Sequence, residues 1–222
     1  MAVTPLAEQD SPEISAALEA AVHAFARDGL HGTSMDAIAA AARLTKPSLY
    51  RRFGSKDALF ERVVEHECTR LTDHLLSAYA LTLELPVEDR LAHSFDAFFR
   101  YAEERPHGFR LLFCTSHHRS STVAGRVDVV RRQVTDRVGA MVRHELAVAG
   151  NESPVAADVL ATALVGMGEF TARRLVEEPA WDREAVVRLL AQFAAAGGMG
   201  VGRRTLRALD GTAAGEAEGD RR

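Results

Sequence analysis

Residues 33–59 read TSMDAIAAAARLTKPSLYRRFGSKDAL, and the rest of the chain can be interpreted outward from them. The stretch predicts two short helices, a tight turn between them, and the start of a third, longer helix. Ser34, Thr45 and Ser55 stand where these helices begin, and each hydroxyl oxygen can accept a hydrogen bond from an otherwise unpaired backbone N–H. Pro47 suits the first turn of the second helix, where a missing N–H has little cost.

Apolar residues at helical spacing give both short helices a buried side. Ile38, Ala39 and Ala42 make a small apolar face on the first, which allows a second helix to cross closely. Leu49 and Phe53 are four residues apart and share one face of the second helix. This arrangement indicates a helix-turn-helix, a motif whose second helix enters the DNA major groove.

Positive charge is concentrated on the second helix and the residues around it. No acidic residue lies between Arg43 and Lys56, and the five basic residues there are Arg43, Lys46, Arg51, Arg52 and Lys56. Lys46 and Lys56 are the only two lysines in the chain. Such cations can neutralise DNA phosphates. The alternative interpretation is a small helical hairpin with a solvated basic face.

The complete string is more specific than its spacing. I-A-x-x-A, a turn, and then T-K-P-S-L-Y-x-x-F-x-S-K-x-x-L closely resembles the DNA-binding domain of the tetracycline-repressor (TetR) family. Together with the helix before it, the resemblance covers roughly residues 12–62. The family usually has Gly in the turn where this chain has Arg43, and Gly is favoured where the backbone needs a positive φ. We therefore expect a strained or slightly altered turn at Arg43.

The exposed side of the second short helix is the predicted DNA-reading surface. Lys46 can donate to guanine, Ser48 can bond several bases, and Pro47 can touch a thymine methyl group. Tyr50 and Lys56 match residues that, the resemblance implies, hold the DNA backbone. The full set of predicted DNA contacts is Thr33, Ser34, Thr45, Lys46, Pro47, Ser48, Tyr50, Arg51 and Lys56. For each, the alternative is a capping or solvated side chain.

The remaining sequence predicts an all-α protein: an N-terminal three-helix helix-turn-helix domain and a larger C-terminal helical ligand-binding and dimerisation domain. We expect disorder over residues 1–11, the DNA-binding domain over 12–62, the regulatory and dimerisation domain over 63–209, and a disordered tail over 210–222. A long helix from Lys56 to about Leu83 links the two halves. Further helices are expected at about 87–104, 107–118, 121–148, 155–177 and 181–196, with glycines at 197–202 interrupting the last.

The last two helices carry more apolar surface than one domain can bury, which favours a four-helix-bundle dimer over an ordinary core. The resemblance also implies a regulatory ligand pocket, for which the candidate residues are Phe95, Phe98, Phe99, Phe113, Met141, Met167, Glu169 and Phe170. Glu169 lies inside an apolar stretch, where an unpaired carboxylate would be costly. It can pair with Arg173, bind a cationic or hydroxylated ligand, or face solvent.

Composition narrows the class of protein. A hydrophobic content of 47% is ample for a core, and a net charge of −4 argues against a nucleic-acid coat but not against a local basic patch. We expect no membrane span and no signal peptide, because charges interrupt every long apolar run and the first residues lack a basic segment followed by an apolar core. Cys68 and Cys114 are expected to be reduced thiols in a cytoplasmic protein.

These features together predict a ligand-responsive transcriptional regulator, with repression favoured by the resemblance. It would bind a palindromic double-stranded DNA operator as a homodimer and be released by a small, largely apolar effector. The alternative is a helical dimeric interaction protein or small-molecule-binding protein that never touches DNA. No motif of a hydrolase, a nucleotide-binding loop or a zinc helix is present, so we expect no enzyme. We also expect no cofactor and no metal, since Cys and His lack ligand spacing.

Overall fold

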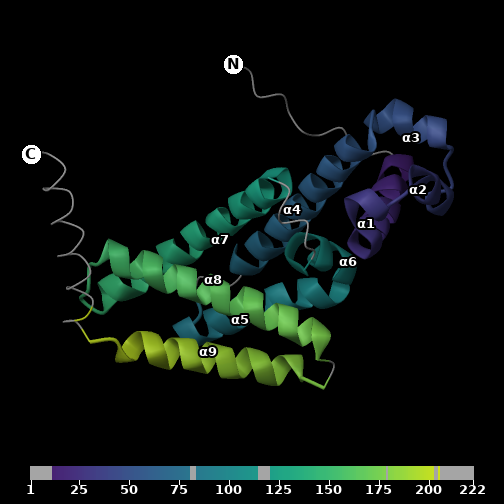
Figure 1. The fold of residues 1–222 in the computed structure, drawn as a ribbon. Coiled ribbons are helices and arrows are strands. Elements are labelled where there is room, and N and C mark those ends of the chain that lie inside the picture. Colours follow the sequence, from purple (N-terminus) through teal and green to yellow (C-terminus); the bar gives the residue numbers. More distant parts are fainter. Residues whose placement is uncertain (1–11, 81–83, 115–120, 179, 203–204, 206–222) are drawn as a thin grey trace, which may run out of the picture. The chain divides into compact units, whose positions relative to one another are not determined.

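The computed structural model describes residues 12–80, 84–114, 121–178, 180–202 and 205, and over these ranges it contains helices and no strands (Figure 1). The helices are α1 (Pro12–Gly32), α2 (Met35–Ala41), α3 (Lys46–Phe53), α4 (Lys56–Ala80), α5 (Val87–Glu104), α6 (Pro106–Phe109) with a π-helical turn η1 (Arg110–Cys114), α7 (Ser121–Val148), α8 (Pro154–Glu177) and α9 (Arg183–Gly200). The all-α prediction is confirmed. The predicted disordered ends, 1–11 and 210–222, lie outside the described residues.

Contacts between residues divide the chain into two compact units. The first comprises Met1–Thr69 and His107–Arg126, and the second comprises Arg70–Pro106 and Val127–Arg222. Residues 107–114 join the first unit because η1 packs against α1. The predicted boundaries, with a DNA-binding domain over 12–62 and a regulatory domain over 63–209, stay a prediction.

The first unit is built on large apolar side chains that are completely removed from solvent. Leu18 and Phe25 of α1, Ile38 of α2, Leu49 of α3 and Leu59 of α4 are each 0% exposed. Burying a side chain of this size stabilises a fold by about 1.5–3 kcal/mol. The shared core therefore fixes α3 against its neighbours and leaves its other face outward.

The turn between α2 and α3 has the strained geometry expected at Arg43. This residue has a φ of 57°, and it is the only residue other than glycine with positive φ in the described chain. The N–H of Leu44 donates to the carbonyl oxygen of Ala39 at 2.8 Å, and the N–H of Arg43 donates to that of Ala40 at 3.2 Å. These two bonds form a Schellman motif, which usually places glycine at the left-handed position.

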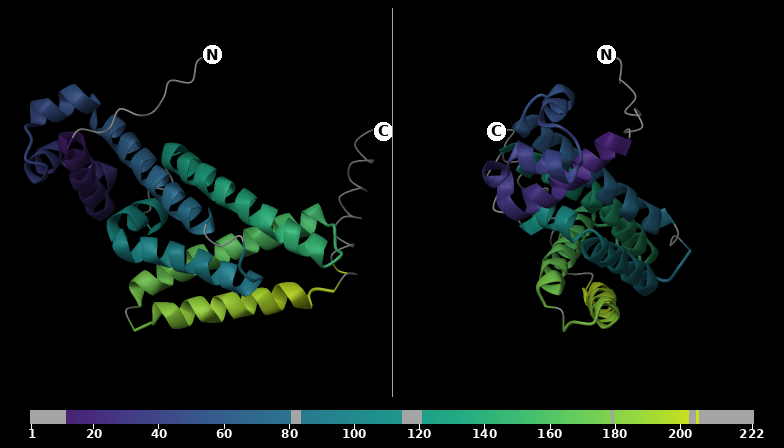
Figure 2. Two further views of the ribbon diagram at one scale, coloured as in Figure 1. Left: turned by 180° about the vertical axis from the view of Figure 1, so that it is seen from behind. Right: turned by 90° about the vertical axis from the view of Figure 1, so that its right-hand side faces the viewer.

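The second unit is a helical bundle in which α5 packs against both α8 and α9 (Figures 1 and 2). A second core joins α7 to α8, and its buried members include Val138, Ala157 and Ala161. Gly168 lets α8 approach α5 closely, since a Cβ there would stand 3.4 Å from the ring of Phe95.

The prediction for the end of α9 is wrong. The helix begins at Arg183 and continues to Gly200, so Gly197, Gly198 and Gly200 do not interrupt it. Glycine inside a helix costs only about 0.5–1 kcal/mol relative to alanine, which the helix can bear. Most of the segment 203–209, where a further helical stretch was considered, lies outside the described residues, as do residues 81–83 at the predicted end of α4.

Among the helices that the structure describes, α8 alone has the length and apolar composition to cross a membrane. The charges in the sequence predict no membrane-spanning segment. Helices in the cores of helical bundles also have these properties, and α8 packs against α5 and α9.

Candidate nucleic-acid interface

The starts of α2, α3 and α4 are each capped by a hydroxyl side chain, as the sequence predicts. Ser34 accepts from the N–H of Asp36 at 3.2 Å, Thr45 from that of Ser48 at 3.3 Å, and Ser55 from that of Ala58 at 3.0 Å. The start of a helix carries the positive end of its dipole and unpaired N–H groups, both of which attract anions.

Two lysines bring these three helix starts together. The ammonium of Lys46, the first residue of α3, donates to Oδ2 of Asp36 in the first turn of α2 at 2.7 Å. The ammonium of Lys56, the first residue of α4, donates to the carbonyl oxygens of Thr33 at 3.1 Å and His31 at 3.4 Å, just before α2. The start of α2 therefore lies within reach of one lysine from the start of α3 and of another from the start of α4.

The exposed face of α3 carries most of the predicted DNA contacts. Lys46, Pro47, Tyr50 and Arg51 are exposed, and Ser48 is partly exposed. Arg51 donates from Nη2 to the hydroxyl of Ser48 at 3.3 Å. The hydrogen bond and charge of Asp36 raise the pKa of Lys46 above its ordinary value. The face combines donors, cations and a phenol that can meet phosphates or base edges.

Thr33, a predicted DNA contact, is buried in the structure. This residue is 3% exposed, and its hydroxyl donates to the carbonyl oxygens of Gly29 at 2.6 Å and Ala24 at 3.1 Å. The hydroxyl is therefore engaged within the protein at the end of α1. Lys56 shares part of this structural role, because its ammonium also binds carbonyl oxygens there. Ser34 and Thr45 are exposed caps of α2 and α3.

Two acidic residues pair with the basic run in contacts that the sequence does not predict. Asp36 binds Lys46, and Glu13 of α1 pairs with Arg52. Both acids lie in the first turn of a helix, where the dipole alone explains an acidic residue. No signal in the sequence therefore distinguishes them as partners of residues ten and thirty-nine positions away.

The residues predicted to line an effector pocket belong to different parts of the structure. Phe95 and Phe99 of α5 are buried with their ring centroids 6.1 Å apart, and Phe95 and Phe98 meet α8 at Gly168. Met141 packs against the core between α7 and α8, and Met167 of α8 is partly buried. Phe113 belongs to the first unit, where its ring centroid lies 5.0 Å from that of Phe109.

Phe170 differs from the prediction of an interior pocket residue. It is 67% exposed, with the guanidinium of Arg173 5.3 Å from its ring centroid. Its position on α8 turns it to the outside of the unit.

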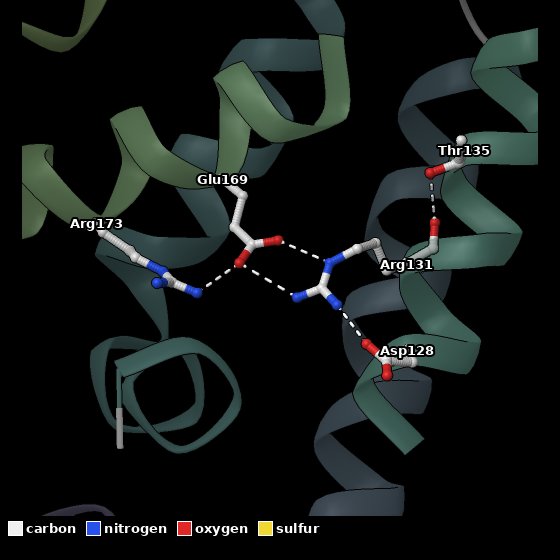
Figure 3. Close-up of polar contacts among 5 residues, drawn as sticks. All are labelled: Asp128, Arg131, Thr135, Glu169 and Arg173. Carbon is white, nitrogen blue, oxygen red and sulfur yellow. Dashed lines mark hydrogen bonds and ion pairs between the residues drawn. The ribbon is translucent and has the colours of Figure 1, made fainter. Parts of the chain in front are cut away.

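Glu169 is neither solvent-facing nor alone (Figure 3). It is 7% exposed and pairs with Arg173 one turn along α8, which was one of the three predicted alternatives. Its carboxylate also accepts hydrogen bonds from Nε of Arg131 in α7 at 3.0 Å and from Nη2 of the same residue at 3.3 Å. Arg131 in turn pairs with Asp128. The carboxylate is therefore compensated within the protein and links α7 to α8.

One group of side chains in the described chain has the spacing of metal ligands. Donor atoms of Glu19, His66 and Glu67 all lie within 4.8 Å of one another. Each of the three also has an interaction within the protein, and buried polar networks of this kind are common structural features. The absence of a metal stays a prediction.

Comparison with known proteins matches both halves of the chain. Residues 17–63 match the family described as bacterial regulatory proteins, tetR family, and residues 87–197 match the tetracyclin repressor-like C-terminal domain. The HTH-type transcriptional activator FasR of Mycolicibacterium smegmatis is 30% identical over 180 residues, which cover 80% of this chain and 78% of that protein. The HTH-type transcriptional repressor SCO4008 of Streptomyces coelicolor is 36% identical over 96 residues, 43% of this chain and 45% of that protein.

Solved structures share the fold. A TetR-like transcriptional regulator from Rhodococcus sp. RHA1 has a TM-score of 0.71 and 28% identity, covering 85% of this chain and 97% of that one. FadR of Bacillus subtilis, solved in complex with stearoyl-CoA, has a TM-score of 0.69 at 11% identity, covering 81% and 96%.

The capped helix starts, the exposed basic face of α3 and the helical second unit define a DNA-binding transcriptional regulator of the helix-turn-helix class. The matches over both halves and the identity to FasR narrow the class further. The chain belongs to the TetR family.

Proposed function

We propose that this protein is a ligand-responsive transcriptional regulator that binds a palindromic operator as a homodimer. The observation that carries the proposal is the meeting of three capped helix starts beside an exposed, basic α3. Lys46, Pro47 and Ser48 would read base edges in the major groove. Tyr50 and Arg51 would hold phosphates, and the N–H groups at the starts of α2 and α4 would add to them.

Exposed apolar side chains on α8 and α9 support the homodimer. Val159 and Phe170 of α8 are 53% and 67% exposed, and Leu189 and Phe193 of α9 are 66% and 68% exposed. The two residues of α8 are eleven positions apart and the two of α9 are four apart. At either spacing, both side chains lie on the same side of their helix. Large apolar side chains in a row of this kind are typical of a surface covered by a second copy.

The effector would be small and largely apolar. Phe95, Phe98 and Phe99 of α5 form the aromatic group that supports this, since apolar ligands bind among such side chains. The complex of FadR with stearoyl-CoA shows that a protein of this fold can hold a long-chain acyl ligand. Ligand binding would shift the population toward a state that releases DNA, by as much as the ligand prefers that state. Because α4 belongs to both units, it would carry this change.

We propose repression as the sign of regulation in the cytoplasm. The relatives differ on this point, since FasR is an activator and SCO4008 is a repressor. A reporter gene behind a bound promoter would decide it: repression predicts higher expression when the regulator is deleted, and lower expression would reverse the sign.

The test of DNA binding is fluorescence anisotropy with a random-sequence duplex over a range of salt concentrations. We expect the affinity to fall linearly with the logarithm of salt, and Arg51→Ala to reduce the slope by about 1 because one phosphate contact is lost. Arg51 is preferable to Lys56, whose ammonium also supports the fold. Arg188→Ala, at an exposed position on α9, is the control and should leave the slope unchanged. A chain that binds no duplex at low salt would instead fit an interaction protein that does not use DNA.

A further inference from the structure

Asp36 is an acidic residue on a surface that otherwise attracts anions. It is the only acidic residue between Thr33 and Lys56, and its side chain is 67% exposed. A carboxylate in that place repels DNA phosphates, so its presence lowers the sequence-independent part of DNA affinity. Its role must therefore lie elsewhere than in phosphate binding.

The helix dipole favours an acidic residue in the first turn of α2, but it does not explain why the carboxylate of Asp36 meets Lys46 of α3. The ion pair with Lys46 is exposed on both sides, at 67% and 47%, and pairs of this kind add little to the stability of a fold. The N-cap of α2 is Ser34 and not Asp36, which occupies the second position of the helix. The distinctive feature of the pair is its geometry: Oδ2 of Asp36 lies 2.7 Å from Nζ of Lys46, across the turn from α2 to α3.

We propose that Asp36 is a positioning residue that directs Lys46 to a G·C base pair. The inference rests on the proposed function, in which α3 lies in the major groove. A lysine ammonium has three N–H donors, and one of them is occupied by Asp36. The other two are available for O6 and N7 of guanine, the two acceptors that this base presents in the groove.

The carboxylate of Asp36 also affects whether the ammonium of Lys46 binds a phosphate or a base. A free lysine is a compact charge on a flexible stem and binds phosphate readily. Next to Asp36, a phosphate oxygen would approach a second anion and be repelled, whereas the neutral edge of guanine would not. Asp36 thus lowers the sequence-independent affinity for DNA and raises the preference for guanine at one base pair in each half-site.

The experiment selects binding sites for the full-length protein from a duplex library with a randomised centre, followed by sequencing. The wild type, Asp36→Asn and Lys46→Ala are compared, with Asp57→Asn as the control. Asparagine keeps the shape of aspartate and removes its charge. Asp57 is an exposed acid in the first turn of α4, so its replacement removes the same charge in the same unit.

We expect Asp36→Asn to lose guanine preference at the one position per half-site where Lys46→Ala loses it, by at least about threefold. One good base contact provides about 5- to 150-fold discrimination, and a positioning residue controls a part of that. Anisotropy with a random duplex should show unchanged or tighter binding for Asp36→Asn. Asp57→Asn should keep the wild-type motif, and adding Asp36→Asn to Lys46→Ala should change the motif no further.

The outcomes separate this inference from the proposed function. If the wild type enriches a motif and Asp36→Asn enriches the same motif with the same guanine preference, the inference is overturned and the proposed function stands. A change at positions that Lys46→Ala does not affect overturns it as well. If the wild type binds no duplex and enriches nothing, the proposed function itself fails.

Discussion

Arg43 holds a backbone conformation that its side chain disfavours. Its φ of 57° lies in the left-handed region, where a residue other than glycine costs about 1–2 kcal/mol. Glycine removes that strain but loses more chain entropy on folding, about 0.5–1 kcal/mol. We therefore expect Arg43→Gly to raise the free energy of unfolding by about 0.5–1 kcal/mol in urea denaturation.

Gly54 provides the opposite test at the other end of α3. Its φ of 78° is also positive, and a Cβ there would meet no atom within 4 Å, so strain alone should determine the result. Gly54→Ala should lower the free energy of unfolding by about 1 kcal/mol. A loss of stability in Arg43→Gly, of similar size to that in Gly54→Ala, would contradict the account of the turn.

His107 predicts a dependence of stability on pH. Burial lowers its pKa below the ordinary value, and the neighbouring charges of His23 and Arg110 lower it further; the rings of His107 and His23 lie 3.9 Å apart. The unfolded chain then binds a proton at a higher pH than the folded one, so the free energy of unfolding decreases as pH falls below about 6.5. Urea denaturation between pH 7.5 and pH 5 should show a shallower decrease for His107→Gln, and an identical slope would argue against this origin.

Ion pairs between two helices can stabilise their packing, and Glu169 forms such a pair. The carboxylate of Glu169 joins α8 to Arg131 of α7, and 9% of its side chain is exposed. Glu169→Gln removes the charge that compensates two arginines, and we expect a loss of about 1–2 kcal/mol, since both arginines keep partial contact with water. Glu177→Gln on the same helix breaks an exposed pair with Arg174 and should cost less than about 0.5 kcal/mol. Equal effects of the two substitutions in urea denaturation would rule out a special role for Glu169.

The sequence could predict those features that depend on residues close together in the chain, such as helix caps and turns. The caps Ser34, Thr45 and Ser55 mark helix starts because a side chain bonds an N–H two or three residues away. The strain at Arg43 could be expected because a known turn normally has glycine there. The same local logic failed at α9, where packing and helix continuity outweighed the weak preference of glycine against helices.

The parts of the site that sequence could not supply are contacts between distant residues. The bond of Lys46 to Asp36 and the pairing of Glu169 with Arg131 join positions whose spacing carries no signal. Thr33 was assigned to DNA for its residue type, whereas its burial under α1 depends on the packing of the whole first unit.

The assembled protein should depend on the exposed apolar surface of α8 and α9. Phe193 is 68% exposed, and Phe193→Asp would place a charge in the proposed dimer interface. Sedimentation velocity at micromolar concentration should show a dimer for the wild type and a monomer for this variant. Val148→Asp is the control, because Val148 is 74% exposed on α7 and should leave the dimer intact. A monomeric wild type would contradict the proposed homodimer.

The most direct test of the whole account is a hydroxyl-radical footprint of the full-length protein on a duplex enriched by selection. Two copies of α3 in successive major grooves predict two protected regions related by two-fold symmetry, about 10–10.5 base pairs apart from centre to centre. A single unpaired protected region, or protection that disappears at the lowest salt concentration used, would contradict the proposal that a dimer reads DNA with this helix.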